Sequence, residues 1–262
     1  YEEIFQEIDI SGLVEKKGII YIWTNKNLKS RNLEIKVRKE LGIEQKLLTQ
    51  KEVLDLEPNL QPVFDAGVIY ESAMHARDPH GILKKIFKLY LERGGKFVQT
   101  NIKNLEQINY NETAIRSENE EYKFEKTVVA SGAFSKSLTD QLGENIPLDT
   151  ERGYHVHFKG KDHLINRPVI FLDRGFGMTP MNQGLRAVGT VELGGLKNPP
   201  SKKRIDYIVK CAKELLPDLG NHEDEWLGFR PTLPDFLPIL GPSLKNKNLS
   251  LIHISEPTRR YS

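Results

Sequence analysis

Arg230 is a single cation within residues 226–241, a stretch of apolar residues and prolines that reads WLGFRPTLPDFLPILG. The prolines stiffen the backbone, and the apolar side chains keep water away from the guanidinium group. A cation in such surroundings needs an anionic partner. Its planar fork suits a carboxylate held by two parallel hydrogen bonds. That carboxylate belongs either to a bound ligand or, as the alternative, to a salt bridge inside the protein, most simply with Asp235.

A second chemically suggestive run covers residues 126–133, where the β-branched sequence KTVV leads into the small residues ASGA. Small residues at the end of a strand allow a cofactor to approach the backbone closely. An ordinary turn between a strand and a helix is the alternative, because single glycines near strand ends are common.

Two further residue types could do chemistry, but their spacing does not support a site. His155 and His157 would share one face of a strand, and no third ligand follows at a diagnostic spacing, so no metal site is predicted. Cys211 is the single cysteine, which excludes an intrachain disulfide, and its helical surroundings predict ordinary core packing.

Composition limits the class of protein. The 262 residues include 38 basic and 36 acidic ones, which leaves a net charge of +2. This balance predicts neither nucleic acid nor an anionic membrane as the main partner. No apolar run approaches the roughly 18 residues of a membrane span, and the start does not read as a signal peptide. We expect a cytoplasmic protein, with peripheral contact to the inner face of the membrane left open.

The first half of the chain alternates between helical and strand patterns. Residues 18–23 and 67–70 are predicted strands, and Leu33, Val37 and Leu41 form a helical stripe. Thr49 and Glu52 predict a capping box. Asp78 followed by Pro79 predicts a helix start, and Gly94 with Gly95 predicts its end. Residues 96–100 are then expected to form a strand.

The second half is richer in strands. Residues 113–118 and 147–158 alternate, and residues 168–172, 176–180 and 185–191 predict an antiparallel meander with turns at 174–175 and 182–184. Ser201 is expected to cap a helix that Pro217 ends, with one buried face. That face consists of Ile205, Ile208, Ala212 and Leu215.

Two of these runs resemble motifs of one enzyme family. Residues 228–241 resemble the segment G-x-R-P-x-x-x-D-x-x-P-x-x-G near the C-terminus of flavin-dependent D-amino-acid dehydrogenases and glycine oxidases, the DAO family. Residues 128–135 resemble its element V-x-A-x-G-A-x-S, which lies against FAD. The resemblance implies that Arg230 holds the substrate carboxylate. It also implies that FAD contacts Ile102, Ala130, Gly132, Ala133 and Ser135, and that Tyr154, Phe176 and Met178 line the substrate pocket, although apolar strand residues such as the last two more often lie in a core.

The sequence departs from the family at both ends. No Gly-x-Gly-x-x-Gly motif follows a strand, although this element places a dinucleotide pyrophosphate on a helix N-terminus. The flavin-contacting G-H-G-x-x-G segment expected after Gly241 is replaced by residues 251–262, which resemble translated sequencing-adapter sequence. We therefore expect a fragment truncated at both ends, which by itself is colourless and inactive.

The expected fold is of the mixed α/β (α+β) class, with an FAD-binding domain interleaved with a substrate domain built on an antiparallel or mixed sheet. Residues 1–77 and 148–228 are assigned to the substrate domain, 78–147 and 229–252 to the FAD-binding domain, and 253–262 to a non-native tail.

The resemblance implies oxidation of a small amino acid by hydride transfer to flavin, with electrons passed on to a quinone or to oxygen. Orientation would supply most of the catalysis, since no protein nucleophile is needed. Two alternatives stay open. One is an oxidase of glycine, sarcosine or another secondary amine from the same family, and the other is a carboxylate-binding or scaffold domain without flavin.

Overall fold

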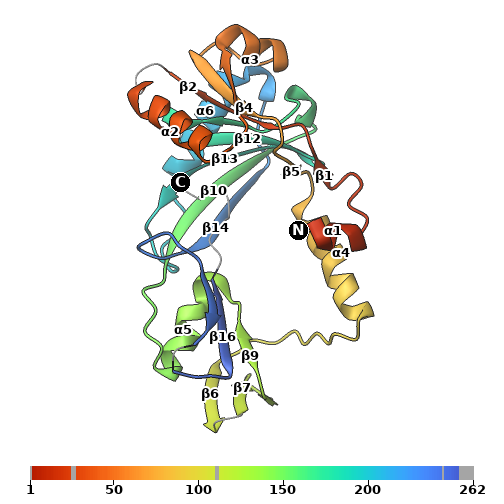
Figure 1. Cartoon of the computed structure of the whole chain (residues 1–262), viewed down its shortest axis with the longest axis vertical. Helices are drawn as coiled ribbons and strands as arrows, with labels where there is room; N and C mark the ends of the chain where they lie inside the picture. Colours follow the sequence, from red (N-terminus) through yellow and green to blue (C-terminus); the bar gives the residue numbers. More distant parts are fainter. Residues whose placement is uncertain (1, 25–27, 110–111, 244, 254–262) are drawn as a thin grey trace.

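The structure is a computed structural model that describes residues 2–24, 28–109, 112–243 and 245–253. Figure 1 shows a large upper region and a smaller lower region, joined by the long strands β10 (Asp149–Lys159) and β14 (Asp224–Thr232). A second connection runs through helix α4 (Pro79–Glu92) and the chain that follows it. Several sheets are combined with helices, so the expected mixed α/β class is confirmed.

An eight-stranded sheet forms the upper region, in the order β14-β10-β13-β12-β11-β2-β4-β3. All its neighbouring strands pair antiparallel except β11 with β2, so the sheet is mixed. Its remaining strands are β2 (Ile19–Trp23), β3 (Lys46–Thr49), β4 (Ala66–Tyr70), β11 (Val169–Phe171), β12 (Phe176–Met181) and β13 (Gly184–Glu192).

The predicted meander is confirmed as β11, β12 and β13. Its first turn ends at Gly175, whose φ of 57° is left-handed, a conformation that glycine adopts at little cost. Its second turn ends at Gly184, where an added Cβ would lie 2.3 Å from the carbonyl oxygen of Phe158 on β10. A side chain at that position would therefore separate the strands.

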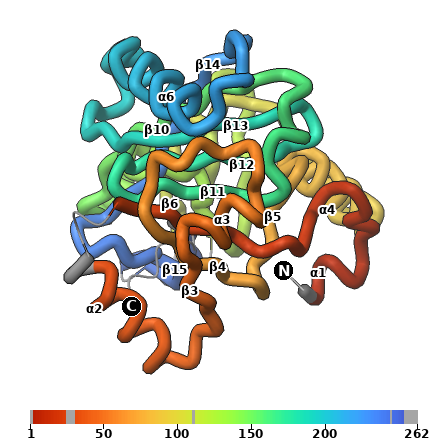
Figure 2. Tube along the Cα trace, turned by 90° about the horizontal axis from the view of Figure 1, so that it is seen from above, coloured from red at the N-terminus to blue at the C-terminus, as the bar shows by residue number. Residues whose placement is uncertain are grey.

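Helix α6 (Lys202–Leu215) covers one face of this sheet, as the view from above shows in Figure 2. The predicted stripe is confirmed, because Ile205, Ile208, Ala212 and Leu215 are all buried, together with Cys211. Ser201 occupies the N-cap, but its side chain accepts no capping hydrogen bond. The helix stops before Pro217, which begins the short 3-10 helix η6 (Pro217–Leu219).

Helices α3 and α4 begin where the capping patterns predict. Helix α3 (Gln50–Leu56) has the complete capping box, because the Thr49 hydroxyl accepts from the Glu52 N–H while the Glu52 carboxylate accepts from the Thr49 N–H. For α4, the Asp78 carboxylate accepts from the Gly81 N–H at 2.9 Å. The remaining α-helices are α1 (Glu2–Glu7), α2 (Leu28–Glu40) and α5 (Ser135–Thr139).

The lower region contains two three-stranded sheets. The first has the order β15-β16-β9, with β16 parallel to β9, and the second is the antiparallel sheet β6-β7-β8. A short pair, β1 (Val14–Glu15) with β5 (His75–Ala76), lies near α4. The strands of the lower region are β6 (Asn104–Asn109), β7 (Glu112–Arg116), β8 (Glu121–Phe124), β9 (Thr127–Val129), β15 (Ile239–Pro242) and β16 (Leu249–His253).

The predicted strand at residues 96–100 is wrong, because this segment has no strand pairing. Side chains attach it to α4 instead. The Tyr90 hydroxyl donates to the Lys96 carbonyl oxygen at 2.7 Å, and the rings of Phe87 and Phe97 meet edge to face at 5.1 Å. Alternation of residue types predicts an extended backbone, but a strand also needs a neighbour that accepts its hydrogen bonds.

The proposed domain limits stay a prediction. One limit, between residues 228 and 229, falls inside β14, which pairs with β10 along its whole length. At the C-terminal side, His253 pairs with Ile239 at the end of β16, and the rest of the predicted non-native tail, residues 254–262, lies outside the described residues.

Candidate functional site

The large sheet presents two chemically different faces. Along β10, Tyr154, Val156 and Phe158 are buried in the core, whereas Glu151 and His155 alternate with them and point to the opposite face. Residues directly opposite each other in an antiparallel pair share a face, so the register assigns every side chain of β14 as well. We call the side under α6 the core face and the other side the Arg230 face.

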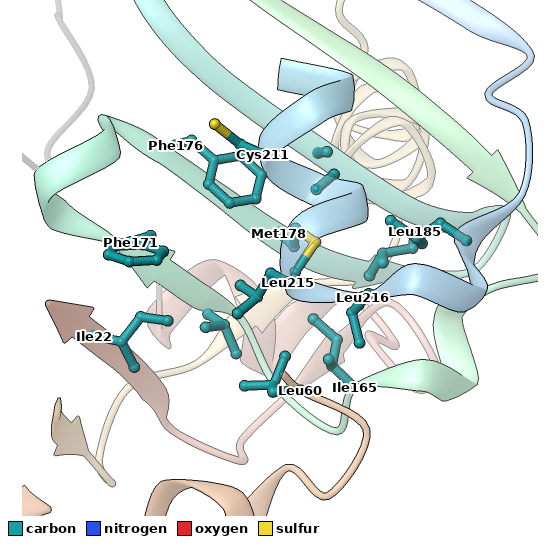
Figure 3. Close-up of a cluster of buried hydrophobic side chains, with 14 of the residues drawn as sticks. Ile22, Leu60, Ile165, Phe171, Phe176, Met178, Leu185, Cys211, Leu215 and Leu216 are labelled. Carbon is teal, nitrogen blue, oxygen red and sulfur yellow. The ribbon is translucent and has the colours of Figure 1, made fainter. Parts of the chain in front are cut away.

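Three of the predicted pocket residues lie on the core face. Phe176 and Met178 are 2% and 0% exposed and pack beneath α6 together with Leu215 (Figure 3). Tyr154 is 1% exposed, and its hydroxyl donates to the Glu192 carboxylate at 2.5 Å while it accepts from the Ser201 N–H at 3.0 Å. The structure therefore separates these three side chains from Arg230 by the thickness of the sheet.

Arg152 also lies on the core face and was not singled out by sequence reasoning. Its side chain is fully buried, its Nε lies 3.3 Å from Glu192 Oε2, and it donates to the Pro199 carbonyl oxygen at 2.8 Å. A buried arginine is stable only with such partners. Arg152 thus ties the loop after β13 to the sheet. The sequence could have pointed to Arg152 through its position next to the Gly-Tyr pair at the start of a predicted strand.

Arg230 pairs with Glu151, the residue opposite it on β10. Their Nη1 and Oε2 atoms are 3.1 Å apart, and the two side chains are 24% and 10% exposed. An ion pair inside the protein is therefore present, as the alternative expected, but the partner is Glu151 and the suggestion of Asp235 is wrong. The Asp235 carboxylate instead accepts from the Leu237 N–H at 3.0 Å, within its own turn. Sequence proximity suggested Asp235, whereas strand register brings Glu151 from 79 residues away.

The next two residue pairs continue the Arg230 face along the same strands. Gly153 lies opposite Gly228, and His155 lies opposite Trp226. The His155 and Trp226 rings are stacked, with centroids 4.7 Å apart and an angle of 19° between planes. This face thus carries an ion pair, then two glycines, then an aromatic pair.

The histidines of β10 are held neutral by their surroundings. Burial, and after it the nearby Arg186 and His157, lowers the pKa of His155 to about 4. Burial and Arg186 also lower the pKa of His157. At neutral pH the positive charge of this face therefore comes from arginine and not from histidine.

The residues expected to contact FAD surround the end of β9. Ala130 is exposed, and Gly132 begins the short 3-10 helix η2 (Gly132–Phe134) with a φ of +56°. An added Cβ on Gly132 would meet no atom of the described structure within 4 Å. Ala133 is 8% exposed, and Ser135 is fully buried at the start of α5. Ile102 lies apart from them in the sequence, in the segment before β6, which has no regular secondary structure.

These residues fit a bound cofactor on two observations. The backbone at Gly132 faces open space in a conformation that disfavours a side chain. Among the described residues, the buried hydroxyl of Ser135 finds no hydrogen-bond partner, and an orphaned buried polar group of this kind marks a place where an external partner can be accepted.

The turn at η2 lies directly beside the strand that carries Arg230. Phe134 contacts Phe229 on β14 edge to face, with ring centroids 6.0 Å apart. Phe229 points to the face opposite Arg230, so this ring contact reaches the strand that carries Arg230 but not the Arg230 side chain. Next to this turn is a cavity of about 480 Å³, lined in part by Ala133, Phe134, Lys136, Asp149, Leu196 and Lys197.

Two features are absent from the described residues. No helix there is long and apolar enough to cross a membrane. No group of three or more histidine, cysteine, aspartate or glutamate side chains in that part of the chain is arranged to hold a metal ion.

Comparison with known proteins identifies relatives over almost the whole chain. Residues 1–254 match the family model described as DAO, FAD dependent oxidoreductase. A D-amino-acid oxidase of Bradyrhizobium diazoefficiens is 29% identical over 254 residues, which cover 95% of this chain and 60% of that protein. A D-amino acid dehydrogenase of Vibrio atlanticus is 27% identical over 249 residues, covering 88% of this chain and 58% of that protein. The chain thus spans about 60% of the length of these curated relatives.

Solved structures of similar fold include two that cover 96% of this chain. Glycine oxidase from Geobacillus kaustophilus matches with a TM-score of 0.83 at 21% identity, over 69% of its own length. L-proline dehydrogenase from P. horikoshii matches with a TM-score of 0.82 at 18% identity, over 70% of its length. At these identities the likeness establishes the fold alone.

Proposed function

Since this chain belongs to the DAO family of FAD-dependent oxidoreductases, we propose that the protein containing it oxidises a small amino acid at the bond between Cα and nitrogen, with Arg230 as the carboxylate anchor. The proposal rests on one observation above all. The single arginine of the Trp226–Gly241 stretch lies half-buried on β14, the strand whose adjacent residue Phe229 contacts the candidate cofactor turn.

Arg230 has the chemistry and the surroundings for this role. Its guanidinium keeps its charge at every physiological pH and can donate two parallel hydrogen bonds to a carboxylate. With 24% of the side chain exposed, the group is reachable by a ligand yet partly desolvated, which strengthens a charge-assisted hydrogen bond.

Glu151 affects which ligands Arg230 can bind. Its carboxylate already pairs with Arg230 at 3.1 Å, so an incoming carboxylate must share the guanidinium or displace Glu151. An amino acid differs from a simple carboxylic acid because it also carries an ammonium group, and Glu151 offers a negative charge to receive it. The pair would therefore favour a zwitterion over an anion of the same size.

Gly132, Ala133 and Ser135 are the residues proposed to hold FAD, with Ala130 and Ile102 at the borders of that site. When bound, FAD would accept the electrons released by the amino acid. The chain's own contribution is to bind the substrate through Arg230, to orient it and to keep water from the reacting bond. Tyr154, Phe176 and Met178 would act from the core face, by supporting the strands that carry the anchor.

D-amino acids are the proposed substrates, because the curated relatives are a D-amino-acid oxidase and D-amino acid dehydrogenases. The electrons would pass on to a quinone or to oxygen. We propose that the protein is cytoplasmic or in peripheral contact with the inner face of the membrane. The test is to express the longer protein that contains this chain, record its flavin spectrum, and supply D-alanine with either oxygen or a quinone analogue. Bound flavin together with bleaching by D-alanine is expected. A flavin that no amino acid reduces would refute the proposal.

A further inference from the structure

We propose that Trp226, backed by His155, is a specificity-determining wall that makes the Arg230 site prefer amino acids with a flat apolar side chain. The inference rests on the proposed carboxylate-binding role of Arg230 and names the class of substrate that this role would serve. It concerns the part of the ligand that Arg230 does not reach.

The indole of Trp226 leans along the strand toward Arg230. A Cβ added to Gly228 would lie 2.0 Å from Cη2 and 2.3 Å from Cζ3 of Trp226, so the six-membered ring of the indole lies over the glycine. Gly228 is the residue between Trp226 and Arg230 on the same face. Only a glycine at this position leaves the indole room to lie flat in that direction.

The spacing matches an amino acid with a ring in its side chain. Two positions along a strand are about 6.6 Å apart, so a ligand of amino-acid size held at the Arg230 guanidinium can extend over Gly228 toward Trp226. Gly153, opposite Gly228, adds to the available space, because a Cβ on it would meet no atom of the described structure within 4 Å. A ligand anchored at Arg230 can thus lay a ring along the indole.

The wall is fixed and apolar. His155 stacks on the indole at 4.7 Å, which holds the ring in one orientation, and yet Trp226 remains 55% exposed. The imidazole is neutral at pH 7, since burial and Arg186 keep its pKa at about 4. The positive charges of Arg186 and Arg230 on this face are balanced by the carboxylates of Asp224 and Glu151, so the face has no excess charge that would recruit a charged side chain. Aromatic and flat apolar side chains are the class that remains.

The test uses the two tryptophans of the chain as separate reporters. Trp23 is 3% exposed and Trp226 is 55% exposed, so their indole N–H signals in an NMR spectrum report a buried reference and the proposed wall. D-phenylalanine and D-alanine, which share the α-carbon groups, are titrated separately into the 262-residue chain. We expect D-phenylalanine to shift the Trp226 signal and to bind between about twofold and about tenfold more tightly than D-alanine, the range of one aromatic pair.

Variants separate the wall from the anchor. Trp226→Ala should abolish the preference for D-phenylalanine and leave D-alanine binding unchanged, whereas Trp226→Phe should retain part of it. Tyr207→Ala is the matched control, because it removes a ring that is 40% exposed on α6, the helix that covers the other side of the sheet. It should change neither affinity.

Equal affinities for the two amino acids in the unchanged chain, or a preference that survives in Trp226→Ala, would overturn the wall and leave the carboxylate anchor standing. Failure of both amino acids to bind, or binding that Arg230→Lys leaves intact, would instead overturn the anchor and the wall together.

Discussion

Replacing Arg230 by lysine keeps the positive charge but removes the planar fork that can hold a carboxylate with two hydrogen bonds. Loss of one charge-assisted hydrogen bond in a partly buried pair costs about 1.5 to 3 kcal/mol. This corresponds to a weakening of D-alanine binding by about tenfold to about 150-fold. The anchor role therefore predicts a large effect on binding.

The same substitution should have little effect on stability. In the structure Arg230 Nη1 lies 3.1 Å from Glu151 Oε2, and 24% of the arginine side chain is exposed to solvent, which screens the ion pair. A lysine can still approach Glu151, so the free energy of unfolding should fall by less than about 1 kcal/mol. For a chain of this length that is a decrease of less than about 4 °C in melting temperature.

Calorimetric titration with D-alanine and thermal unfolding of the same samples measure both quantities. Glu151→Gln is the informative companion, because it removes the charge that competes for Arg230 while keeping the shape of the side chain. Under the anchor role it should weaken binding of D-alanine, whose ammonium group loses its proposed partner, and strengthen binding of propionate, which carries the carboxylate alone. If the pair is purely structural, both variants lose melting temperature to a similar extent and neither changes the affinity, and that result would refute the reasoning.

Three further predictions follow from the described geometry. Met178→Ala should lower the free energy of unfolding by about 2 to 5 kcal/mol in urea titration without changing D-alanine affinity, because the side chain is 0% exposed on the core face; a loss of affinity at unchanged stability would place it in the pocket. His155 has a pKa of about 4 in the folded protein, below its ordinary value of 6.5. Between pH 6.5 and pH 4 the unfolded chain therefore binds a proton that the folded protein does not, and the free energy of unfolding falls as pH falls, by at most about 3 kcal/mol. His155→Phe should remove this part of the pH dependence, and identical pH–stability curves for the two proteins would contradict the assignment. Gly132→Ala should lower the free energy of unfolding by about 1 kcal/mol, because the φ of Gly132 is +56°. The control Gly153→Ala, at a glycine outside the left-handed region, should leave stability nearly unchanged. Equal melting temperatures of the two variants would exclude strain at Gly132.

Local signals in the sequence were sufficient for most elements. The capping box at Thr49 and Glu52, the N-cap at Asp78 and the apolar stripe of α6 each depend on neighbouring residues, and all three predicted the observed helices. The strand predicted at residues 96–100 was wrong because pairing is a property of two segments, and the sequence pattern describes only one of them.

The candidate site was harder to predict for the same reason. Alternation along β10 and β12 indicates that successive side chains point to opposite faces, but it does not say which face α6 will cover. Tyr154, Phe176 and Met178 were therefore grouped with Arg230, although the register places them on the core face. The partner of Arg230 also depends on register, which brings Glu151 across from a distant strand.

The two faces of the β10–β14 pair have a consequence for how such a protein can diverge. Its ladder consists of backbone hydrogen bonds, and neighbouring residues on each strand serve opposite sides of the sheet. If the Arg230 face binds the substrate as proposed, a substitution at Glu151, His155 or Trp226 would alter what is bound while leaving the contacts beneath α6 in place. Selection can therefore change specificity at little cost in folding, and the agreement in fold with glycine oxidase, a TM-score of 0.83 at only 21% identity, is what such independence permits.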